Sequence, residues 1–374
     1  MRILVLSWRD PRHPLAGGAE QVMHEHMKGW VKAGHEVTLF SSHFGDVRKK
    51  ETIDDIQIIR KGGQLLGVHI GAFFWYIFGK HDKYDFVVDQ FHFIPFFTPL
   101  YIRKPKIAVL QEIAKSVWLK NPLPKPYNVV LGSIGYMIEP IIFLLYRKTK
   151  FITGSQSAKQ DLAGIMKIPA NNITVIPHGV IIQRPRPFPK KETVKTVIYL
   201  GALAKDKGVE DALVAFSLLN RQEEYQFWVV GKPESEAYFE RLKGMVKKSG
   251  LDRKLKFWGF VSQEKKFDLL ARAHLMVNPS VHEGFGLVNI EANAMGTPVV
   301  AYRSQGLIDS VKDGVSGIIV DKNSPEALVE VISKLIQSGN YGEYCMGSVR
   351  WSKRFNWDKS KEQSLKLIES LGYS

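Results

Sequence analysis

Cysteine is nearly absent from this sequence of 374 residues, in which Cys345 is the single example. An intramolecular disulfide is therefore excluded, which fits a reducing compartment. The apolar run near the amino terminus, residues 3–6, is too short for the hydrophobic segment of a signal peptide, and no small-residue cleavage pattern follows it. We therefore expect a cytoplasmic protein.

Several motifs of phosphate and metal chemistry are missing as well. No Gly-x-Gly-x-x-Gly follows the first predicted strand and no Walker lysine pattern occurs, so nicotinamide and P-loop chemistry are unsupported. His24 and His26 lie two positions apart in a predicted helix, where their side chains point about 200° apart. Because such a pair does not readily share an ion, we expect no metal.

Acidic residues are scarce in the first half of the chain. The net charge is +15, and residues 1–190 carry 26 Lys and Arg against 14 Asp and Glu, whereas residues 191–374 carry 26 against 23. The first half therefore contacts something anionic or has a solvated basic surface. Phospholipid, nucleic acid and phosphorylated substrates all fit this charge.

Aromatic residues gather in the same half, at 73–78 (FFWYIF) and 91–101. A basic patch beside exposed aromatics suits an anionic membrane surface, and the alternative is that the aromatics are core and the basic residues solvated. No nucleic-acid module is recognisable, so we expect no nucleic acid. Glu139 and Pro140 interrupt the apolar stretch 128–146, which predicts a packed or interfacial helix rather than a membrane span. The basic residues are Arg103, Lys104, Lys106, Lys115, Lys120 and Lys125.

The beginning of the chain has the pattern of a βαβ unit. A buried-type strand at 3–6 is followed by a loop with Gly17 and Gly18, a helix at 19–32 and a strand at 36–40. This order predicts a parallel sheet. Further strands are expected at 56–60, 86–89, 107–110 and 151–154.

A second alternation of strands and helices follows residues 183–193, which hold three prolines and four basic residues and are a predicted linker. The fold class is therefore α/β, with two doubly wound parallel-sheet domains at 1–185 and 193–352. In open α/β sheets ligands bind beyond the carboxyl ends of the strands, so we expect a site in a cleft between the domains. Strands are expected at 196–200, 226–230, 254–258, 275–278, 298–301 and 317–320, with helices at 208–219 and 264–272.

The most informative segment is 279–291, PSVHEGFGLVNIE. It follows a strand, contains a flexible Gly-x-Gly and enters a helix. A carboxylate, here Glu283 or Glu291, can accept hydrogen bonds from both vicinal hydroxyls of a ribose. Backbone N–H groups at a helix N-terminus can hold a diphosphate.

The pattern PS…EGFGL…EAxAxGTPVVA resembles the donor-site signature of glycosyltransferase family 4, the group 1 enzymes with the GT-B fold. Seven residues separate Glu283 and Glu291, as in that family, and the resemblance covers nearly the whole chain. It implies a retaining transferase that moves a hexose from a UDP- or GDP-sugar to a lipid-linked or glycan acceptor, with no metal. Domain 1–185 would then bind the acceptor and domain 193–352 the donor, and a helix at about 355–374 would cross back onto the first domain.

The resemblance also assigns roles within the segment. Glu291 would hold the ribose, while Glu283 and the backbone of Phe285, Gly286 and Leu287 would hold the sugar and the phosphates. The leaving phosphate itself would act as the base. The interpretation that Glu283 and Glu291 are merely capping or surface acids is the alternative.

The start of the second domain departs from the family pattern. Relatives have an arginine straight after Gly201 and a lysine before Gly208, and both cations neutralise the leaving diphosphate. This sequence keeps Lys207 but has Ala202 at the arginine position. Lys205 is a candidate for the missing charge.

Two sites in the first domain also match the family. Gly17 and Gly18 resemble the glycine loop that approaches the donor diphosphate, where the backbone comes close to the anion. Many relatives have a histidine near Gln111, which here can hydrogen-bond a sugar hydroxyl but cannot titrate. Two rivals stay open, namely a nucleotide-sugar epimerase of the same fold and a non-catalytic nucleotide-sugar binder, which Ala202 favours.

Overall fold

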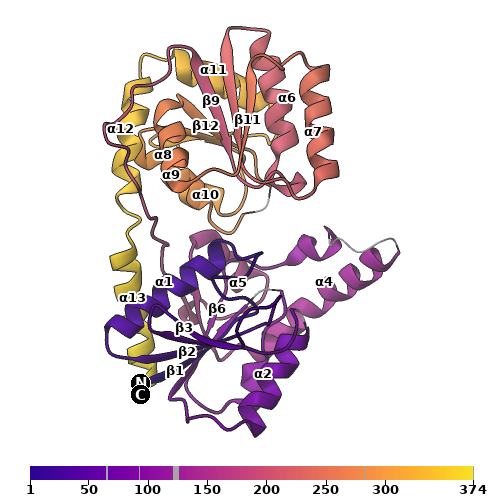
Figure 1. The fold of residues 1–374 in the computed structure, drawn as a ribbon, viewed down its shortest axis with the longest axis vertical. Coiled ribbons are helices and arrows are strands. Elements are labelled where there is room, and N and C mark those ends of the chain that lie inside the picture. The colour runs from indigo at the N-terminus through magenta and orange to yellow at the C-terminus, as the bar shows by residue number, and fades with distance from the viewer. Residues whose placement is uncertain (65, 92, 121–125, 282, 374) are drawn as a thin grey trace. The chain divides into compact units, whose positions relative to one another are not determined.

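The computed structural model describes residues 1–373 except 65, 92, 121–125 and 282. The chain forms two compact units, of which the N-terminal unit is Met1–Gly179 with Trp357–Ser374, and the C-terminal unit is Val180–Asn356 (Figure 1). The division thus falls after Gly179, and residues 180–185, which the sequence analysis placed in the first domain, lie in the C-terminal unit.

The N-terminal unit is built on an eight-stranded sheet in the order β3-β4-β2-β1-β5-β6-β7-β8. All neighbouring strands are parallel except the β3–β4 pair, which is antiparallel. The short strands β3 and β8 were not predicted. The strands are β1 (Arg2–Leu6), β2 (Glu36–Ser41), β3 (Lys50–Ile53), β4 (Ile56–Arg60), β5 (Phe86–Gln90), β6 (Lys106–Val109), β7 (Lys150–Thr153) and β8 (Ile173–Val175).

Helices cover both faces of this sheet. Because side chains alternate along a strand, Ile3 and Val5 of β1 pack with α1 and α13, whereas Leu4 and Leu6 pack with α2. Leu6, Asp89 and Ala108 are in register across β1, β5 and β6, and Ala108 packs with α4, so α2 and α4 cover the same face. The helices are α1 (Gly18–Lys32), α2 (Leu66–Phe78), α3 (Thr98–Tyr101), η1 (Lys115–Lys120), α4 (Tyr127–Leu145), α5 (Gln156–Gly164), η2 (Ala170–Asn172) and α13 (Trp357–Gly372).

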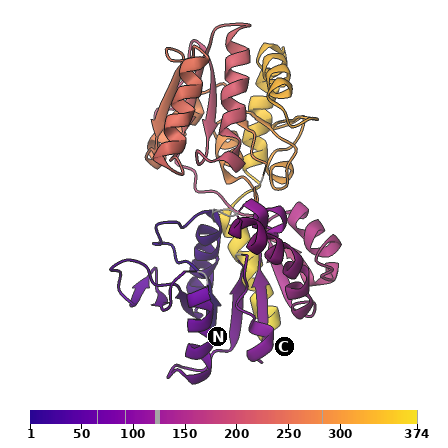
Figure 2. The ribbon, with the colours of Figure 1, turned by 90° about the vertical axis from the view of Figure 1, so that its right-hand side faces the viewer.

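The carboxyl-terminal helix α13 completes the N-terminal unit. Figures 1 and 2 show it alongside α1. Trp30 Nε1 donates a hydrogen bond of 3.1 Å to Ser364 Oγ, and His26 Nε2 lies 3.0 Å from Ser360 Oγ. Ile368 is fully buried in the same apolar cluster as Trp30, so the last helix supplies part of this core.

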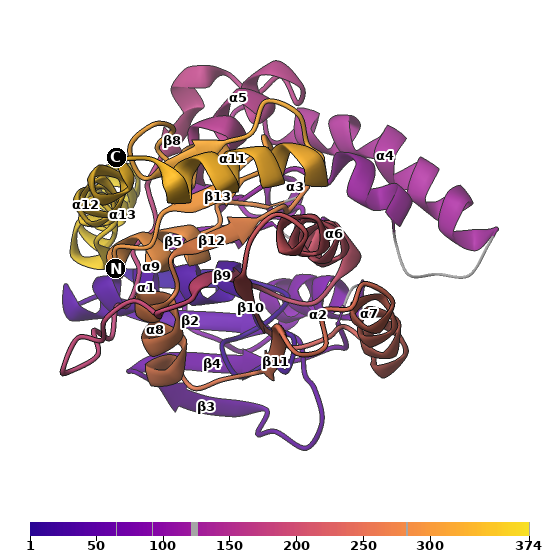
Figure 3. The same ribbon diagram turned by 90° about the horizontal axis from the view of Figure 1, so that it is seen from above.

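The helix α4 is the longest of the described helices and is almost wholly apolar. Among the described residues it is the one helix long and apolar enough to cross a membrane, by length and composition only. Figure 3 shows it reaching outward from the N-terminal unit. One side, with Gly132, Glu139 and Phe143, is buried against the unit, while most of its apolar residues are exposed.

The C-terminal unit has a six-stranded, fully parallel sheet in the order β11-β10-β9-β12-β13-β14. The strands are β9 (Lys195–Leu200), β10 (Tyr225–Val230), β11 (Leu255–Gly259), β12 (Leu275–Asn278), β13 (Val299–Ala301) and β14 (Gly317–Ile319). The helices are η3 (Lys205–Lys207), α6 (Val209–Asn220), α7 (Glu236–Lys248), α8 (Gln263–Arg272), α9 (Leu287–Ala294), α10 (Leu307–Ser310), α11 (Pro325–Gln337) and α12 (Tyr341–Ser352).

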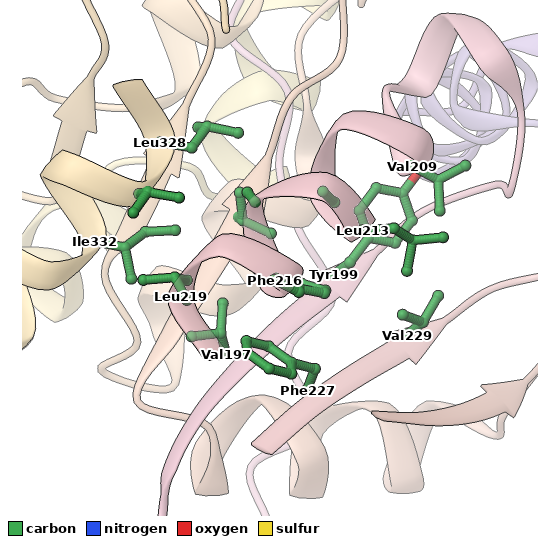
Figure 4. Close-up of a cluster of buried hydrophobic side chains, with 14 of the residues drawn as sticks. Val197, Tyr199, Val209, Leu213, Phe216, Leu219, Phe227, Val229, Leu328 and Ile332 are labelled. Atoms are coloured by element: carbon green, nitrogen blue, oxygen red, sulfur yellow. The ribbon is translucent and has the colours of Figure 1, made fainter. Parts of the chain in front are cut away.

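An apolar core fixes this sheet against α6 and α11 (Figure 4). Phe216 of α6 stacks on Phe227 of β10 with ring centroids 4.4 Å apart. Leu328 and Ile332 of α11 are fully buried in the same cluster. This packing holds the carboxyl ends of β9 and β12, from which the loops with the predicted donor residues leave.

The predicted linker is anchored at its end. Lys191 donates hydrogen bonds of 2.6 Å to the Ala273 carbonyl and 2.7 Å to Thr297 Oγ1. Burial lowers the pKa of Lys191 to about 8. Glu192 accepts a hydrogen bond of 2.6 Å from Arg272 Nε. The last residues of the linker therefore lie against the C-terminal unit.

Candidate functional site

The loop between β12 and α9 carries the predicted donor segment. Gly286 has φ +82° and precedes the first residue of α9, where a residue with a side chain would be strained. A Cβ on Gly306 would lie 2.3 Å from the Glu283 carbonyl oxygen, so Gly306 lets the α10 segment approach this loop. His282 of the same segment lies outside the described residues.

Lys207 and Glu283 meet at this loop. Lys207 Nζ donates a hydrogen bond of 2.8 Å to Glu283 Oε2. The loops that carry them are joined, because the Val281 N–H donates to the Asp206 carbonyl at 3.0 Å. At Gly208, which has φ +69°, a Cβ would lie 2.1 Å from the Pro279 carbonyl oxygen. The close packing of the two loops brings a cation and a carboxylate from distant segments together.

Glu291 lies one turn into α9, and its side chain is mostly buried. Its Oε1 accepts a hydrogen bond of 2.6 Å from Lys266 Nζ on α8. Burial raises the pKa of Glu291, and the Lys266 ammonium offsets part of that effect. Lys266 was not predicted, because nothing in the sequence pairs residues from two different helices.

A buried polar chain fixes the orientation of α9. Asn278 Nδ2 donates to Asn289 Oδ1 at 2.8 Å, and Asn289 Nδ2 donates to Ser310 Oγ at 2.9 Å. Buried amides that pair in this way specify one arrangement, since leaving either amide unpaired is costly. Phe285 packs on Phe355 with ring centroids 5.5 Å apart. The N-terminus of α9, with Leu287 as its first residue, is therefore held in place.

Because Ala202 stands where relatives have an arginine, the site lacks one positive charge. Ala202 and Lys205 are both exposed. The Tyr199 hydroxyl donates to the Ala202 carbonyl at 2.8 Å, and burial raises the pKa of that hydroxyl well above its ordinary value. This turn of backbone is therefore ordered, and the exposed Lys205 lies two residues before Lys207 in the single turn of η3.

The glycine loop of the N-terminal unit is held by two side chains. The Gly17 N–H donates to Glu20 Oε2 at 2.7 Å, and Trp8 Nε1 donates to the other oxygen of Glu20 at 3.3 Å. Gln90, at the end of β5, donates from Nε2 to the Ala19 carbonyl at 3.2 Å. Gly17 and Gly18 thus begin α1 in a fixed position. The roles of Glu20 and Gln90 were not predicted.

Gln111 follows β6 at the carboxyl edge of the N-terminal sheet. Within the described part of the chain, neither its amide oxygen nor its amide nitrogen has a hydrogen-bond partner, although both atoms are buried. A buried amide without partners is costly, and a ligand hydroxyl can satisfy both of its atoms. This observation favours the predicted contact with a substrate.

The predicted site residues thus fall into two groups. Gly17, Gly18 and Gln111 belong to the N-terminal unit, and all the others belong to the C-terminal unit. Among the residues described, no group of three or more His, Cys, Asp and Glu is placed to hold a metal ion. Independence from metal stays a prediction, which a chelator in the transfer assay tests.

Comparison with known proteins relates both units to sugar transferases. A family model of the group 1 glycosyl transferases matches residues 181–346, and one of glycosyltransferase family 4 matches residues 16–184. An uncharacterized glycosyltransferase of Methanocaldococcus jannaschii is 23% identical over 400 residues, covering 99% of this chain and 98% of the relative.

Solved structures share the fold at low sequence identity. Sucrose-phosphate synthase from Thermosynechococcus elongatus gives a TM-score of 0.80 at 19% identity, over 99% of this chain and 98% of its own. HepE of Anabaena, in complex with UDP and glucose, gives a TM-score of 0.73 at 18% identity, over 99% and 100% of the two chains.

The two Rossmann-like parallel-sheet units define the GT-B class of sugar transferases. The chain belongs to the group 1 glycosyltransferases of family 4, whose two family models together span residues 16–346.

Proposed function

We propose that this glycosyltransferase moves a hexose from a UDP- or GDP-sugar to a lipid-linked or glycan acceptor at the cytoplasmic face of a membrane, with retention of configuration. One observation carries the donor half of the proposal. Lys207 and Glu283 form an ion pair of 2.8 Å beside the N-terminus of α9, and Glu291 lies one turn further along that helix. A cation, a helix N-terminus and two carboxylates are the groups that a diphosphate, a ribose and a sugar require.

The donor class also has support from a protein of the same fold. HepE is described as a complex with UDP and glucose. In this chain Glu291 would accept hydrogen bonds from the ribose hydroxyls, and the first N–H groups of α9 would face the phosphates. Glu283 would hold the sugar together with the backbone of Phe285, Gly286 and Leu287.

Transfer needs charge stabilisation more than a protein base. The acceptor oxygen bonds to the anomeric carbon while the bond from that carbon to the leaving phosphate breaks. An oxygen of the leaving phosphate takes the hydroxyl proton. Lys207 would stabilise the negative charge that grows on this diphosphate, with Lys205 as the second cation in place of the missing arginine at Ala202.

The N-terminal unit would serve the acceptor. Gln111, whose buried amide has no partner among the described residues, is the residue best suited to bind an acceptor or sugar hydroxyl. Closure of the two units would bring the Gly17 and Gly18 loop onto the donor diphosphate and exclude water, which otherwise competes as the acceptor.

A panel of UDP-, GDP- and ADP-sugars tests the proposal through nucleotide release and transfer by the purified protein. We expect slow release from one donor, lost in Glu291→Ala and kept in Glu264→Ala, which removes an exposed carboxylate of α8. Products are also analysed for epimerised donor in the absence of an acceptor. No release and no binding with any donor would contradict the proposal.

Ala202 favours a second candidate, a nucleotide-sugar binder without turnover. The exposed alanine removes one of the two cations that stabilise the leaving group. Calorimetric binding of a donor, with no release of nucleotide from it in any acceptor mixture, would support this candidate. Restored release in Ala202→Arg would then identify the missing charge as the cause.

A further inference from the structure

The outer side of α4 is an unusually large exposed apolar surface. At 3.6 residues per turn, its exposed apolar residues cover an arc of about 220°. Met137 and Ile141, near the middle of that arc, are 72% and 62% exposed. The exposed set is Tyr127, Val129, Val130, Leu131, Ile134, Tyr136, Met137, Ile138, Ile141, Leu144 and Leu145.

The helix α2 presents a second exposed apolar surface in the same unit. It covers the same sheet face as α4, and its outward side exposes Phe74 and Phe78 together with Leu66, Ile70, Phe73 and Ile77. Soluble monomeric proteins rarely expose contiguous apolar patches of this kind without a binding role. We therefore expect the outer side of α2 and α4 to bind a partner.

The basic residues near this apolar surface indicate what kind of partner binds it. Three helices of this region, α2, α3 and α4, are each followed by a pair of exposed basic residues. The pairs lie just before β5, β6 and β7, neighbouring strands of the sheet, and Asp82 and Asp85 are the acids among them. Apolar surface flanked by cations matches an anionic lipid surface. The pairs are Lys80 and Lys83, Arg103 and Lys104, and Arg147 and Lys148.

The geometry of α4 favours a bilayer over a protein partner. The uncharged apolar arc covers more than half the circumference of α4. A protein partner would have to wrap around the helix to cover it, whereas fluid acyl chains adapt to its shape. The one charge within the helix, Glu139, is on the buried side. That side is packed on the unit through Phe143, so a docked α4 would lie along a membrane surface and would not span it.

Glu139 links this helix to the loop after β6. Its carboxylate accepts hydrogen bonds from the Ala114 N–H at 2.8 Å, the Lys115 N–H at 2.9 Å and Trp118 Nε1 at 3.2 Å. A Cβ on Gly135 would lie 2.4 Å from the Trp118 ring, so the indole lies directly on α4. The chain from Gln111 to η1 is thus fastened to the helix.

We infer that the outer side of α2 and α4 docks into the surface of an anionic lipid bilayer, and that Glu139 transmits this docking to the loop of Gln111. A headgroup-linked acceptor would then meet the Gln111 amide at the membrane surface. The acceptor step rests on the proposed function, whereas docking and its transmission to the loop do not. In this scheme Glu139 is a positioning residue.

Vesicle sedimentation tests the docking. The wild-type protein is expected to sediment with phosphatidylcholine vesicles that contain phosphatidylglycerol, and less with pure phosphatidylcholine or in high salt. The triple variant Ile134→Ser, Met137→Ser and Ile141→Ser is expected to bind at least about tenfold more weakly. The matched control, Phe260→Ser with Met346→Ser, removes exposed apolar residues of the C-terminal unit and is expected to bind as the wild type does.

Two outcomes overturn the docking. One is that the wild-type protein sediments with neither kind of vesicle, or that the triple variant binds the vesicles as strongly as the wild type does. The other is a wild-type dimer in solution that the triple variant converts to a monomer, because this surface would then be an interface between copies. Donor release without vesicles is measured separately, so that its failure counts against the proposed function and not against docking.

Hydrogen exchange tests the transmission. Phosphatidylglycerol-containing vesicles are expected to slow deuterium uptake in residues 110–118 of the wild type. In Glu139→Gln, where an amide N–H₂ replaces one acceptor, the vesicles still bind but that slowing is lost. Should Glu139→Gln unfold, Gly135→Ala displaces Trp118 instead. Equal slowing in wild type and variant, or none in the wild type, would overturn the role of Glu139.

Discussion

Each of the two donor-site carboxylates is paired with a lysine in the unliganded protein. Glu291 pairs with Lys266 at 2.6 Å, and both side chains are 14% exposed, whereas the Glu283 and Lys207 side chains are about twice as exposed. Removing one partner of a buried pair leaves an uncompensated charge, which costs more than losing an exposed pair. Lys266 therefore offsets part of the cost of burying the Glu291 carboxylate, whereas Lys207 belongs to the more exposed pair, which costs less to rearrange around a ligand.

Lys207 is the residue whose loss should slow turnover most. We expect Lys207→Met to lower kcat by about 10²- to 10³-fold, because a charge stabiliser of the leaving group is removed. Lys205→Met removes the same charge from the exposed end of the same turn and is expected to cost about tenfold or less. Steady-state kinetics with the identified donor measure both. An equal loss of kcat in the two variants would show that Lys205 stabilises the leaving diphosphate as much as Lys207 does.

The ionisation of Glu291 should appear in donor binding. Burial raises its pKa, so the neutral form gains population at a higher pH than for an ordinary glutamate. Since the ionised carboxylate accepts from the ribose, donor affinity should fall as the pH is lowered through that raised pKa, by about tenfold per unit at most.

Calorimetric titration of the donor from neutral into mildly acidic solution measures this effect. Glu291→Gln cannot ionise, and its weaker binding should lack this component of the pH dependence. An identical pH profile in the wild type and in Glu291→Gln would remove Glu291 from the ribose site.

At the scale of the element, the joined loops after β9 and β12 depend on Gly208. Both Gly208 and Gly250 have positive φ, but only at Gly208 would a Cβ meet another atom within 4 Å. Gly208→Ala should therefore lower the free energy of unfolding by about 3 kcal/mol or more, and Gly250→Ala by about 1–2 kcal/mol. Denaturant unfolding compares them, and equal losses would show that the contact with Pro279 is not limiting.

Elements also explain which strands were predicted. The strands of the sheet interior contain apolar runs, as in 86–88 (FVV) and 227–230 (FWVV), and each was predicted within one or two residues. The strands β3 and β8 are short edge strands, and β3 (KETI) has charges in place of an apolar run. Their formation depends on the neighbour that they pair with, which no local pattern contains.

At the scale of the whole molecule, the two ends of the chain share one core. The helix α13 packs on α1 so closely that a Cβ on Gly29 would lie 2.8 Å from the Cβ of Lys361. Gly29→Leu should therefore destabilise the N-terminal unit by about 2 kcal/mol or more. Gly244→Leu, at a helical glycine with nothing within 4 Å, should be neutral or stabilising by a few tenths to about 1 kcal/mol.

Differential scanning calorimetry, in which the two units unfold in separate transitions, measures the change in stability of each variant. The transition of the N-terminal unit should move in Gly29→Leu and that of the C-terminal unit in Gly244→Leu. A shift of the wrong unit, or no shift in Gly29→Leu, would argue against a structural role for α13.

The sequence by itself determined the class of fold, the family and the donor segment. Apolar runs, glycines and the spacing of Glu283 and Glu291 are local features, which can be recognised from the order of residues along the chain. The tertiary structure alone decided the pairing of Glu291 with Lys266, the burial of the Gln111 amide without a partner among the described residues, and the exposure of α4 with Glu139 turned inward. These depend on which distant segments pack together, because burial and partnership are properties of packing and not of spacing along the chain.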